Sequence, residues 1–421
     1  MAAVTESQIA IVKATAPVLQ EHGVAITTAF YENLFRDVPA LLNVFNNANQ
    51  ATGRQQRALA GAVLAYATYI DDLPKLKYAV ERIAHKHVSL QVTPEQYDIV
   101  GQYLIQAIGQ VLGDAATPEI VDAWVAAYGA LAQVFINREG EMYKSNAAEG
   151  WVGWRKFRIA RKERESSVIT SFYLVPADGD APLPKYYPGQ YVSLQVPLPQ
   201  LDRLQSRQYS LSEGPKPTGE YYRISVKKED GVTPETTNIP GVISNLLHDK
   251  YNVGDEVELS HPQGEFYVDP SDESKAGVPA VLISAGVGAT PLKAILDGLT
   301  AAGAVSRPIS WIQSARSSAA LPFGEAVRQV CREHDNVTAN VFLRNLGPDD
   351  QVGVHYEFGD MRLDLAKLHP ETHLFATDPR AEYFVCGPEA FMADVRSALI
   401  ALGVDRSRIF LELFGTGDVP E

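Results

Sequence analysis

In the first third of the chain, apolar positions recur every three to four residues. Between residues 78 and 91 they fall on one helical face, and His87 lies on that face. Prolines are few, and Thr5, Thr93 and Thr117 precede helix-like runs, where a threonine side chain suits an N-cap. The pattern therefore predicts a region that is all helix.

The pattern changes near residues 146–154. From about residue 157 to 267, short stretches alternate apolar and polar residues, as in Ser167–Val175 and Tyr222–Val226, and proline and glycine separate them. Alternation with a period of two is typical of strands that bury one face. We expect a small antiparallel β-barrel or sandwich here.

The last part of the chain alternates apolar strands with helices. The runs Ala280–Ser284 and Glu382–Cys386 each lead into a glycine turn. This alternation indicates a parallel, doubly wound sheet of the nucleotide-binding kind. The predicted fold is thus multidomain, with an all-α domain over 1–147, an antiparallel β-barrel domain over 153–268 and an α/β doubly wound parallel-sheet domain over 276–421.

Length and charge narrow the functional classes. A chain of 421 residues is too long for one compact core. Its 37 lysines and arginines against 51 aspartates and glutamates leave a net charge of −14, which disfavours binding to nucleic acid or to anionic membranes. Only Cys331 and Cys386 are cysteines, and we find no export signal or run of ~18 apolar residues. We expect a cytoplasmic chain without stable membrane association, and we take it to be monomeric.

One histidine of the helical third faces inward. Val80, Ile83 and Ala84 share a helical face with His87, whereas His85 lies off that face. An imidazole on an apolar stripe is more often a hydrogen-bonded core residue than a ligand of a metal or haem. A second observation is needed to favour a ligand site.

The last helix of this region supplies that observation. Glu139 follows Phe135 by four residues on the inward face, and a buried carboxylate needs a partner. Tyr97, in the first turn of the helix that follows Thr93, can also face inward. His87, Tyr97 and Glu139 suit a set in which the carboxylate fixes the tautomer of a ligating histidine. Spacing alone leaves a purely structural hydrogen-bond cluster equally open.

The opposite wall of the helical region has two ambiguous polar residues. Gln55 shares a helical face with Leu59 and stands three residues after Thr52. It either closes a capping box with Thr52 or donates a hydrogen bond to a bound diatomic molecule. Tyr31, on a preceding segment with Phe45, is either a core aromatic residue or a pocket hydroxyl.

Two segments of the middle region suit a cofactor phosphate. In Arg207–Ser210 the arginine can pair with a phosphate, the tyrosine can stack on a planar ring and the serine can reach a ring nitrogen. Gly241, followed by Ser244 before a helix expected over 245–248, offers backbone N–H groups to an anion. Together the two segments predict a pyrophosphate site, whereas Arg207 alone suits a solvated strand edge.

A glycine turn follows the first strand of the last region. Thr290 suits the N-cap of the next helix and Pro291 its first position. Glycines let a dinucleotide pyrophosphate approach the backbone at the positive end of that helix. The turn departs from G-x-G-x-x-G at position 291, and its residues are Gly286, Val287, Gly288, Ala289, Thr290 and Pro291.

The choice between NADH and NADPH depends on the end of the next strand. An acidic residue there would hold the ribose 2′-OH, whereas an arginine accommodates a 2′-phosphate. The stretch Gln313–Ser317 contains Arg316 and no acid. This favours NADPH, although Arg316 suits a solvated loop position equally well.

The helical third resembles the globin domain of the flavohaemoglobins throughout its length. The shared motifs are Phe30–Tyr31, Phe45–Asn46, Gln55 with Leu59, Lys86–His87, Pro94–Tyr97 and Phe135–Glu139. The resemblance implies haem b with His87 as the proximal iron ligand. It also implies that Tyr97 and Glu139 form a proximal relay, that Lys86 modulates the haem, that Phe45 packs on it, and that Tyr31, Gln55 and Leu59 line the oxygen side.

The remainder resembles the ferredoxin-reductase-like flavoproteins that form the second part of the flavohaemoglobins. The resemblance implies FAD bound by Tyr191, Arg207, Gln208, Tyr209 and Ser210, with the segment from Glu412 to Phe414 placing an aromatic ring against the flavin. The glycine turn and the motif Cys386, Gly387, Pro388 match the family's nicotinamide-nucleotide site and imply NAD(P)H. Leu413 and Thr416 stand where some relatives have Cys and Pro.

Over nearly the full chain, the resemblance implies nitric oxide dioxygenase activity. Electrons would pass from NAD(P)H to FAD as a hydride and then singly to haem, and the reduced haem with O₂ would convert NO to nitrate. O₂ and NO are the expected small-molecule substrates. Two alternatives stay open: an oxygen-binding or sensing haemoprotein with a built-in reductase, and an NAD(P)H-dependent diaphorase or peroxide reductase.

Overall fold

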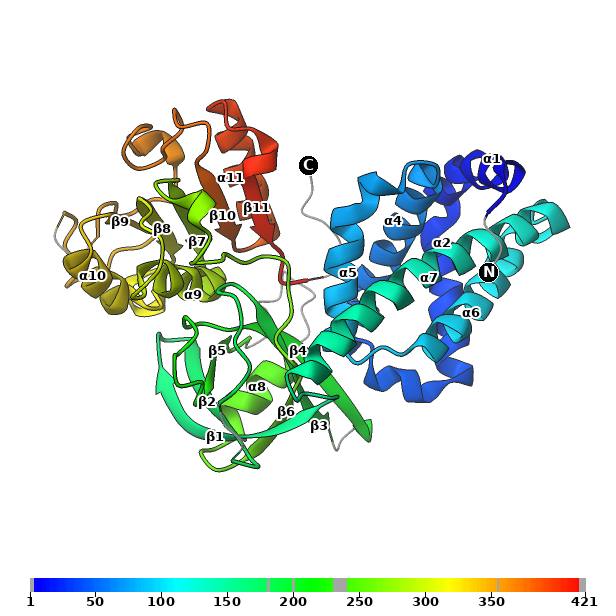
Figure 1. Cartoon of the computed structure of the whole chain (residues 1–421), viewed down its shortest axis with the longest axis horizontal. Helices are drawn as coiled ribbons and strands as arrows, with labels where there is room; N and C mark the ends of the chain where they lie inside the picture. The colour runs from blue at the N-terminus through cyan, green and yellow to red at the C-terminus, as the bar shows by residue number, and fades with distance from the viewer. Residues whose placement is uncertain (1–3, 180–181, 199–200, 230–240, 354–355, 416–421) are drawn as a thin grey trace. The chain divides into compact units, whose positions relative to one another are not determined.

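The computed structural model describes residues 4–179, 182–198, 201–229, 241–353 and 356–415. It divides into two compact units, of which the first comprises residues 1–155, 193–207 and 415–418 and the second comprises 156–192, 208–414 and 419–421. Along the chain, helices come first, then an antiparallel sheet, then a parallel sheet (Figure 1). The predicted fold class is confirmed, and the three domain boundaries stay a prediction.

The expected threonine caps begin three of the helices. Thr5 and Thr93 each form a capping box, with Gln8 and Gln96 three residues later. Thr117 is the N-cap of a third helix, without a side-chain cap bond to a backbone N–H. The α-helices of this region are α1 (Glu6–Ala14), α2 (Ala16–Asp37), α3 (Asn47–Ala51), α4 (Arg54–Tyr69), α5 (Lys77–Ser89), α6 (Pro94–Leu112) and α7 (Pro118–Ala148).

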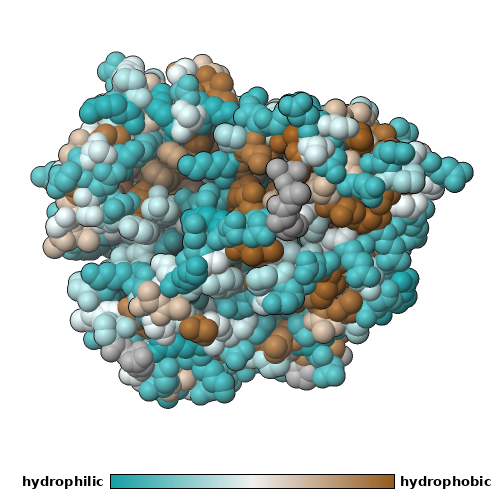
Figure 2. Space-filling view, turned by 45° about the vertical axis from the view of Figure 1, so that its right-hand side comes forward, coloured by the Kyte–Doolittle hydropathy of each residue, from teal (hydrophilic) through white to brown (hydrophobic). Residues whose placement is uncertain are grey.

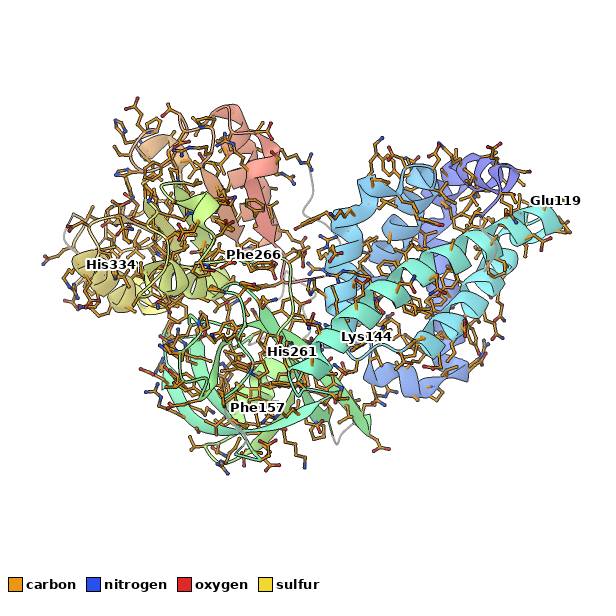
Figure 3. All side chains as sticks on the ribbon, viewed as in Figure 1. Glu119, Lys144, Phe157, His261, Phe266 and His334 are labelled. Carbon is orange, nitrogen blue, oxygen red and sulfur yellow. The ribbon has the colours of Figure 1, made fainter. Side chains whose placement is uncertain are left out.

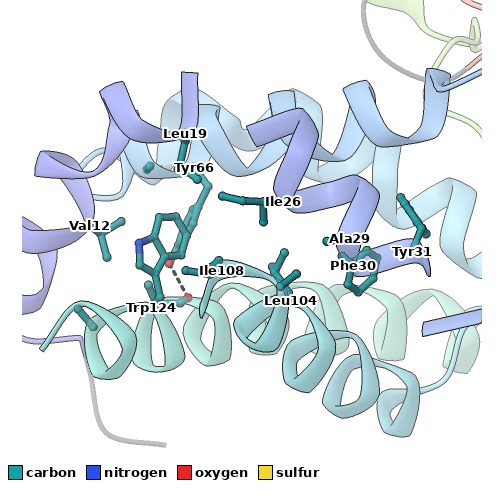
Figure 4. Close-up of a cluster of buried hydrophobic side chains, with 14 of the residues drawn as sticks. Val12, Leu19, Ile26, Ala29, Phe30, Tyr31, Tyr66, Leu104, Ile108 and Trp124 are labelled. Atoms are coloured by element: carbon teal, nitrogen blue, oxygen red, sulfur yellow. Dashed lines mark hydrogen bonds between the residues drawn. The ribbon is translucent and has the colours of Figure 1, made fainter. Parts of the chain in front are cut away.

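One apolar core joins helices α1, α2, α4, α6 and α7. Val12 and Trp124 lie toward one end of the cluster drawn in Figure 4, and Tyr31 lies at the other. Its polar atoms are bonded inside the core, because Trp124 Nε1 donates to Thr15 Oγ1 at 3.1 Å and Tyr66 Oη donates to the Ala127 carbonyl at 2.8 Å. These bonds fix the relative rotation of the helices that present the site.

Helix α7 spans the region from Glu119 to Lys144 and beyond (Figure 3). By length and composition alone it could cross a membrane. It packs, however, against α1, α5 and α6, and its Glu139 is buried. Gly101 of α6 permits one close approach, because a Cβ there would lie 2.4 Å from the ring of Tyr128. We interpret α7 as the core helix of the helical domain.

The antiparallel sheet has the order β4-β3-β6-β1-β2-β5. A bridge between Leu211, just after β4, and Ile224 of β5 brings the two edges of the sheet together, as in a barrel. The predicted stretches Ser167–Val175 and Tyr222–Val226 correspond to β2 and β5. The elements are β1 (Arg155–Arg164), β2 (Ile169–Pro176), β3 (Tyr191–Leu198), β4 (Arg203–Ser210), β5 (Tyr222–Lys227), α8 (Val242–Asp249) and β6 (Glu256–Leu259).

The parallel sheet has the order β11-β10-β7-β8-β9. Side chains of α9 and α10 pack with one face of the sheet, around Trp311, and those of α11 pack with the other, around Tyr383. The chain changes direction between β7 and β10, the switch point at which such sheets bind ligands. The elements are β7 (Ala280–Ala285), α9 (Ala289–Thr300), β8 (Ile309–Ala315), α10 (Gly324–Glu333), β9 (Val337–Leu343), β10 (Glu382–Cys386), α11 (Glu389–Ala401) and β11 (Ile409–Glu412).

Charged groups lie mostly at the surface, and the face drawn in Figure 2 mixes hydrophilic side chains with smaller apolar groups. Arg307 is an exception, with 2% of its surface exposed. Its Nη2 lies 2.6 Å from Oε2 of Glu382, and its Nε donates to the Val278 carbonyl at 2.7 Å. Lys275 also pairs with Glu382. A buried guanidinium without its carboxylate would keep its charge and lose its partner.

We predict that Glu382→Gln lowers the free energy of unfolding by about 3 kcal/mol, because it leaves Arg307 buried without a counter-charge. Urea denaturation followed by circular dichroism measures this change. Glu325→Gln is the matched control, since Glu325 pairs with Arg328 at 2.9 Å on the surface, and such pairs contribute less than about 1 kcal/mol. Equal losses in the two variants would contradict the prediction.

Candidate functional site

Three helices bring His87, Tyr97 and Glu139 together. His87 lies near the end of α5, Tyr97 in the first turn of α6 and Glu139 on α7. His87 Nδ1 is 2.8 Å from Tyr97 Oη and 2.9 Å from Glu139 Oε1, and Tyr97 Oη donates to the same Glu139 oxygen at 2.6 Å. The set expected from the sequence is present as a triangle of three atoms within hydrogen-bond distance of one another.

The triangle determines which nitrogen of His87 is available to a ligand. Glu139 is 3% exposed and its carboxylate only accepts hydrogen bonds, so the neutral imidazole places its proton on Nδ1. The lone pair is then on Nε2, for which the described residues offer no hydrogen-bond partner. This is the tautomer of a metal-ligating histidine whose second nitrogen is held by a carboxylate. The donor set therefore fits an iron porphyrin.

Packing holds the ring of His87 in this orientation. The Phe135 ring lies 5.8 Å from the His87 ring and stacks on the Tyr97 ring at 6.2 Å. Tyr128 Oη donates to the Tyr97 carbonyl at 2.6 Å, which ties the start of α6 to α7. The position of Tyr97 thus depends on both a ring stack and a backbone bond.

Burial raises the pKa of Tyr97, and the nearby Glu139 carboxylate raises it further. Both effects disfavour a phenolate, the first by removing water and the second by charge repulsion. Tyr97 is therefore a neutral donor to Glu139 throughout the physiological range of pH.

On the wall that the sequence predicts to lie opposite His87, Tyr31 is packed among aromatic rings. Its ring centroid lies 4.7 Å from that of Phe30, 5.6 Å from Phe35 and 5.5 Å from Phe45. Burial raises the pKa of Tyr31, and the nearby polar side chain of Gln55 opposes this effect. The expected pair of Tyr31 and Gln55 is brought together.

The capping-box alternative for Gln55 is wrong. The N-cap of α4 is Gly53, in a left-handed conformation with φ of 69°, and Thr52 Oγ1 lies 3.4 Å from the Asn49 carbonyl. A glycine adopts this conformation without steric cost, so the helix begins one residue later than a Thr52 cap would place it. Gln55 is thereby free of the cap and turns toward Tyr31.

Apolar side chains flank this wall without being fully buried. Phe45, Leu59 and Val63 pack against the helical core and are each only partly buried. Such side chains suit a flat apolar ring system between the helices. The position of Leu59 fits the predicted oxygen side, and its role there stays a prediction.

Two residues that the resemblance singled out, Phe45 and Lys86, make polar contacts within the first unit. Gln205 is 1% exposed and donates through Nε2 to the carbonyls of Leu42 and Phe45, at 2.9 and 3.2 Å. Lys86 Nζ lies 3.4 Å from the Gly415 carbonyl. Sequence reasoning missed Gln205, because a strand glutamine gives no signal of the distant carbonyl that it will meet.

Gln50 of α3 was also missed. Its side chain acts on the Tyr31 hydroxyl together with that of Gln55. The helix α3 is only five residues long and has no apolar periodicity that could have predicted it.

The flavin segment lies on β4. Ser210 Oγ is buried and has no hydrogen-bond partner in the part of the chain that the structure describes. A buried hydroxyl without a partner is costly, so it fits a polar atom of a bound cofactor. Tyr191 pairs with Gln263, and its ring lies against Gly264, where a Cβ would come within 3.0 Å of it. Arg207, Gln208 and Tyr209 are partly buried on the same strand.

The helix after Gly241 is longer than expected. It begins at Val242, so Ser244 lies inside the first turn and does not open the helix. Ser244 Oγ donates to the Gly241 carbonyl at 2.9 Å, which stabilises the turn. A Cβ at position 241 would lie 2.5 Å from Ser244 Oγ and 2.8 Å from Cβ of Glu229, so a larger residue would displace one of these side chains. A joint pyrophosphate site of Arg207 and this helix stays a prediction.

The glycine turn meets the second nucleotide motif at the switch point. A Cβ on Gly288 would lie 2.3 Å from the carbonyl oxygen of Cys386, so only glycine lets the two strand ends approach. Gly286 has φ of 58°, which also favours glycine. Cys386 is fully buried, and burial and the nearby Glu412 raise its pKa. The Cys386 thiol is therefore neutral.

The start of helix α9 differs from the expectation. Helix α9 begins at Ala289 with Gly288 as its N-cap, so the expected N-cap Thr290 and the expected first position Pro291 are both wrong. Thr290 Oγ1 donates to the Val287 carbonyl at 2.9 Å. The turn Gly286–Gly288 already has helical curvature and continues into α9. Thr416 lies outside the described residues.

The remaining nucleotide residues stand at strand ends. Pro388 is the N-cap of α11, just after Gly387, and Glu412 pairs with Cys386 where β11 lies beside β10. Arg316 follows β8 directly. Phe414 is 47% exposed. Residues of the glycine turn, the Cys386 motif and Glu412 thus gather at the carboxyl ends of neighbouring strands.

Comparison with known proteins decides the family. The globin family model matches residues 28–135, and the oxidoreductase NAD-binding domain model matches residues 282–397. The flavohemoprotein of Bordetella pertussis is 47% identical over 412 residues, which cover 97% of this chain and 98% of the relative. The chain belongs to the flavohemoproteins.

Solved structures agree with this assignment. The crystal structure of the flavohemoglobin from Malassezia yamatoensis, with bound FAD and haem, matches with a TM-score of 0.83 and 30% identity, over 98% of this chain and 100% of that chain. The FAD/NAD-binding domain of the nitric oxide dioxygenase from Vibrio cholerae matches with a TM-score of 0.51 and 37% identity, over 62% of this chain and 98% of that chain. This flavohemoprotein is thus an oxidoreductase with globin and NAD-binding domains.

We predict that Tyr97→Phe reduces the loss of stability at alkaline pH. The raised pKa of Tyr97 means that the unfolded chain releases this proton first, near pH ~10. The stabilisation is therefore complete below that pH and is lost as the pH rises above it. Without the hydroxyl, the free energy of unfolding should fall less steeply above pH ~10, by about 1.4 kcal/mol per pH unit.

Urea denaturation between pH 9 and 12, in roughly half-unit steps, measures these slopes. Tyr78→Phe serves as the control, because Tyr78 is 56% exposed. A Tyr97→Phe slope identical to that of the control would contradict the prediction.

We predict that Gly288→Ala weakens NAD(P)H binding at least about tenfold, a loss of ~1.4 kcal/mol. The added Cβ would meet the Cys386 carbonyl, so the glycine turn has to move away from the end of β10. Titration with NADH and NADPH measures the change. Gly109→Ala, where a Cβ meets nothing within 4 Å, should leave both affinities unchanged, and an unchanged affinity in Gly288→Ala would refute the argument.

Proposed function

We propose that this flavohemoprotein is an NAD(P)H-dependent nitric oxide dioxygenase. The observation that carries the proposal is His87, whose Nδ1 is held by the buried Glu139 while Nε2 stays available. A simple oxygen carrier needs no carboxylate behind its iron ligand and no fused NAD-binding domain. The match to a reductase domain described as part of a nitric oxide dioxygenase supports the proposal.

The residues fit haem b at His87 and FAD at Tyr191 and Arg207–Ser210, with NAD(P)H at the glycine turn. When bound, FAD would take a hydride from NAD(P)H and release electrons singly to haem, whose iron would supply the site where O₂ and NO combine to nitrate. The orphaned Ser210 hydroxyl supports the flavin site. Arg316, at the end of β8, supports NADPH as the donor.

On the proximal side, Glu139 draws the Nδ1 proton of His87 toward itself. This raises the electron density on Nε2 and makes the imidazole a stronger ligand, as carboxylate partners do for other ligating histidines. Tyr97 donates to the same oxygen and limits how far the proton moves, because the carboxylate shares its charge between two donors. The set therefore tunes the ligand and fixes its orientation.

On the opposite side, the Tyr31 hydroxyl and the Gln55 amide are the polar groups available to a small bound molecule. Tyr31 stays protonated because burial raises its pKa, so it can donate its proton in a hydrogen bond. Leu59 would restrict access to the same space. A monomeric state and a cytoplasmic location are part of the proposal.

Rapid mixing of the reduced, oxygenated protein with NO tests the function. We expect nitrate to form in step with NO consumption while NAD(P)H is oxidised over many turnovers. A carrier or sensor whose reductase only keeps its haem reduced would not sustain NAD(P)H oxidation at the rate of NO supply, and a diaphorase would oxidise NAD(P)H equally fast without NO. Either of those results would overturn the proposal.

We predict that Glu139→Gln retains haem and lowers nitrate turnover about tenfold to hundredfold, since removal of such a carboxylate partner has effects of this size. Glutamine keeps the shape and the hydrogen bond but carries no charge. The matched control is Glu141→Gln on the same helix, whose carboxylate is 70% exposed. Equal turnover in the two variants would contradict the role of Glu139.

A further inference from the structure

The side chain of Gln50 is near enough to the Tyr31 hydroxyl to lower its pKa. Gln56 Nε2 is 3.4 Å from the backbone carbonyl of Gln50 and 3.1 Å from its side-chain Oε1. A backbone carbonyl only accepts hydrogen bonds, so it fixes the Gln56 amide with its nitrogen toward Gln50. That nitrogen in turn requires the oxygen of the Gln50 amide to face it. The orientation of Gln50 follows from this chain of two bonds.

Its nitrogen is therefore turned away from Gln56. Gln50 Nε2 is buried, and no atom of the described residues meets the full geometry of a hydrogen bond to it. A buried amide nitrogen without a partner costs about 1 to 3 kcal/mol, so an acceptor is expected nearby. The Tyr31 hydroxyl is close enough for the Gln50 side chain to lower its pKa against the larger effect of burial. Catalytic hydrogen bonds are often long before ligands bind and then tighten.

The ring of Tyr31 has little freedom to move. It is 4% exposed, and the rings of Phe30, Phe35 and Phe45 surround it. Only the rotation of its hydroxyl proton is left open. A hydroxyl carries one proton and two lone pairs, so a donor on its oxygen leaves the proton for a different acceptor.

We propose that Gln50 is a positioning residue that donates through Nε2 to the Tyr31 oxygen and so directs the Tyr31 proton toward the small molecule bound opposite His87. The inference rests on the proposed function of the Tyr31 side as the ligand side. Gln56 is the outer anchor, because it occupies the only acceptor atom that the Gln50 side chain could otherwise offer to Tyr31. Gln55 and Gln50 then act on one hydroxyl from two helices, α4 and α3.

Carbon monoxide is the probe, because the C–O stretch of its complex with the reduced holoprotein reports hydrogen-bond donation without any turnover. In wild-type protein, one C–O band should come from molecules whose CO accepts a hydrogen bond from Tyr31. In Gln50→Leu we expect this band to lose most of its intensity to a band at higher frequency. The O₂ dissociation rate should rise about fivefold to tenfold, the effect of roughly one lost neutral hydrogen bond. Gln56→Leu should shift both quantities in the same direction by less, since Gln50 then loses only its anchor.

Gln102→Leu is the matched control, because Gln102 is exposed on α6. If Gln50→Leu does not bind haem, Gln50→Glu provides the same test with the shape preserved and the donor removed. Infrared bands and O₂ release equal to those of the control would overturn the role of Gln50, even if nitrate formation is normal. Failure of nitrate formation with the band shift present would instead refute only the proposed function.

A Tyr31→Phe background tests whether Gln50 acts through Tyr31. In that background, the hydroxyl that Gln50 directs is absent. Gln50→Leu should therefore leave the C–O band frequencies in place and change the O₂ dissociation rate by less than about twofold. A full effect in that background would show that Gln50 contacts the ligand itself and would overturn its positioning role.

Discussion

The burial of one carboxylate constrains the helical domain more than any other single feature. Glu139 is 3% exposed, and an ionised carboxylate removed from water costs several kcal/mol unless hydrogen-bond donors surround it. Tyr97 and His87 are those donors, and they come from two other helices. The angle and register of α5, α6 and α7 must therefore satisfy one oxygen atom. A structure that meets this requirement also leaves Nε2 of His87 as the only imidazole atom available to a ligand.

The nucleotide end of the chain depends on a different constraint, the close approach of two backbones. Gly288 meets the Cys386 carbonyl where a Cβ would lie 2.3 Å away, and Glu412 lies beside Cys386 on the next strand. Sterics and not electrostatics set this geometry, because the atoms in contact are neutral backbone groups. Different donor side chains can satisfy a buried carboxylate, whereas glycine is the only residue that lacks a Cβ. The two ends of the chain therefore tolerate substitution differently.

The sequence predicted features that depend on local periodicity and failed where a tertiary contact decides. His87 and Glu139 could be placed inward because each lies on an apolar stripe, and Glu382–Cys386 matched β10 because a buried parallel strand is continuously apolar. The Thr290 cap failed because glycine turns with helical curvature can extend a helix backward. The capping box at Gln55 failed because Gly53 took the left-handed conformation. Gln50 and Gln205 were not foreseen, since their partners lie on other elements.

The two walls of the helical site differ in the kind of group that they present, and this difference follows from the fold. Behind His87 the partner is an ionised carboxylate, which can only withdraw a proton from the imidazole. Around Tyr31 the partners are neutral amides, which can only direct a proton that the phenol keeps. An exchange of the two chemistries would weaken both, because a carboxylate beside Tyr31 would hold the hydroxyl proton for itself, and a neutral amide behind His87 would raise its electron density less than a carboxylate does. The placement of one buried charge on α7 and none on α3 or α4 therefore separates electron donation from proton donation within a single domain.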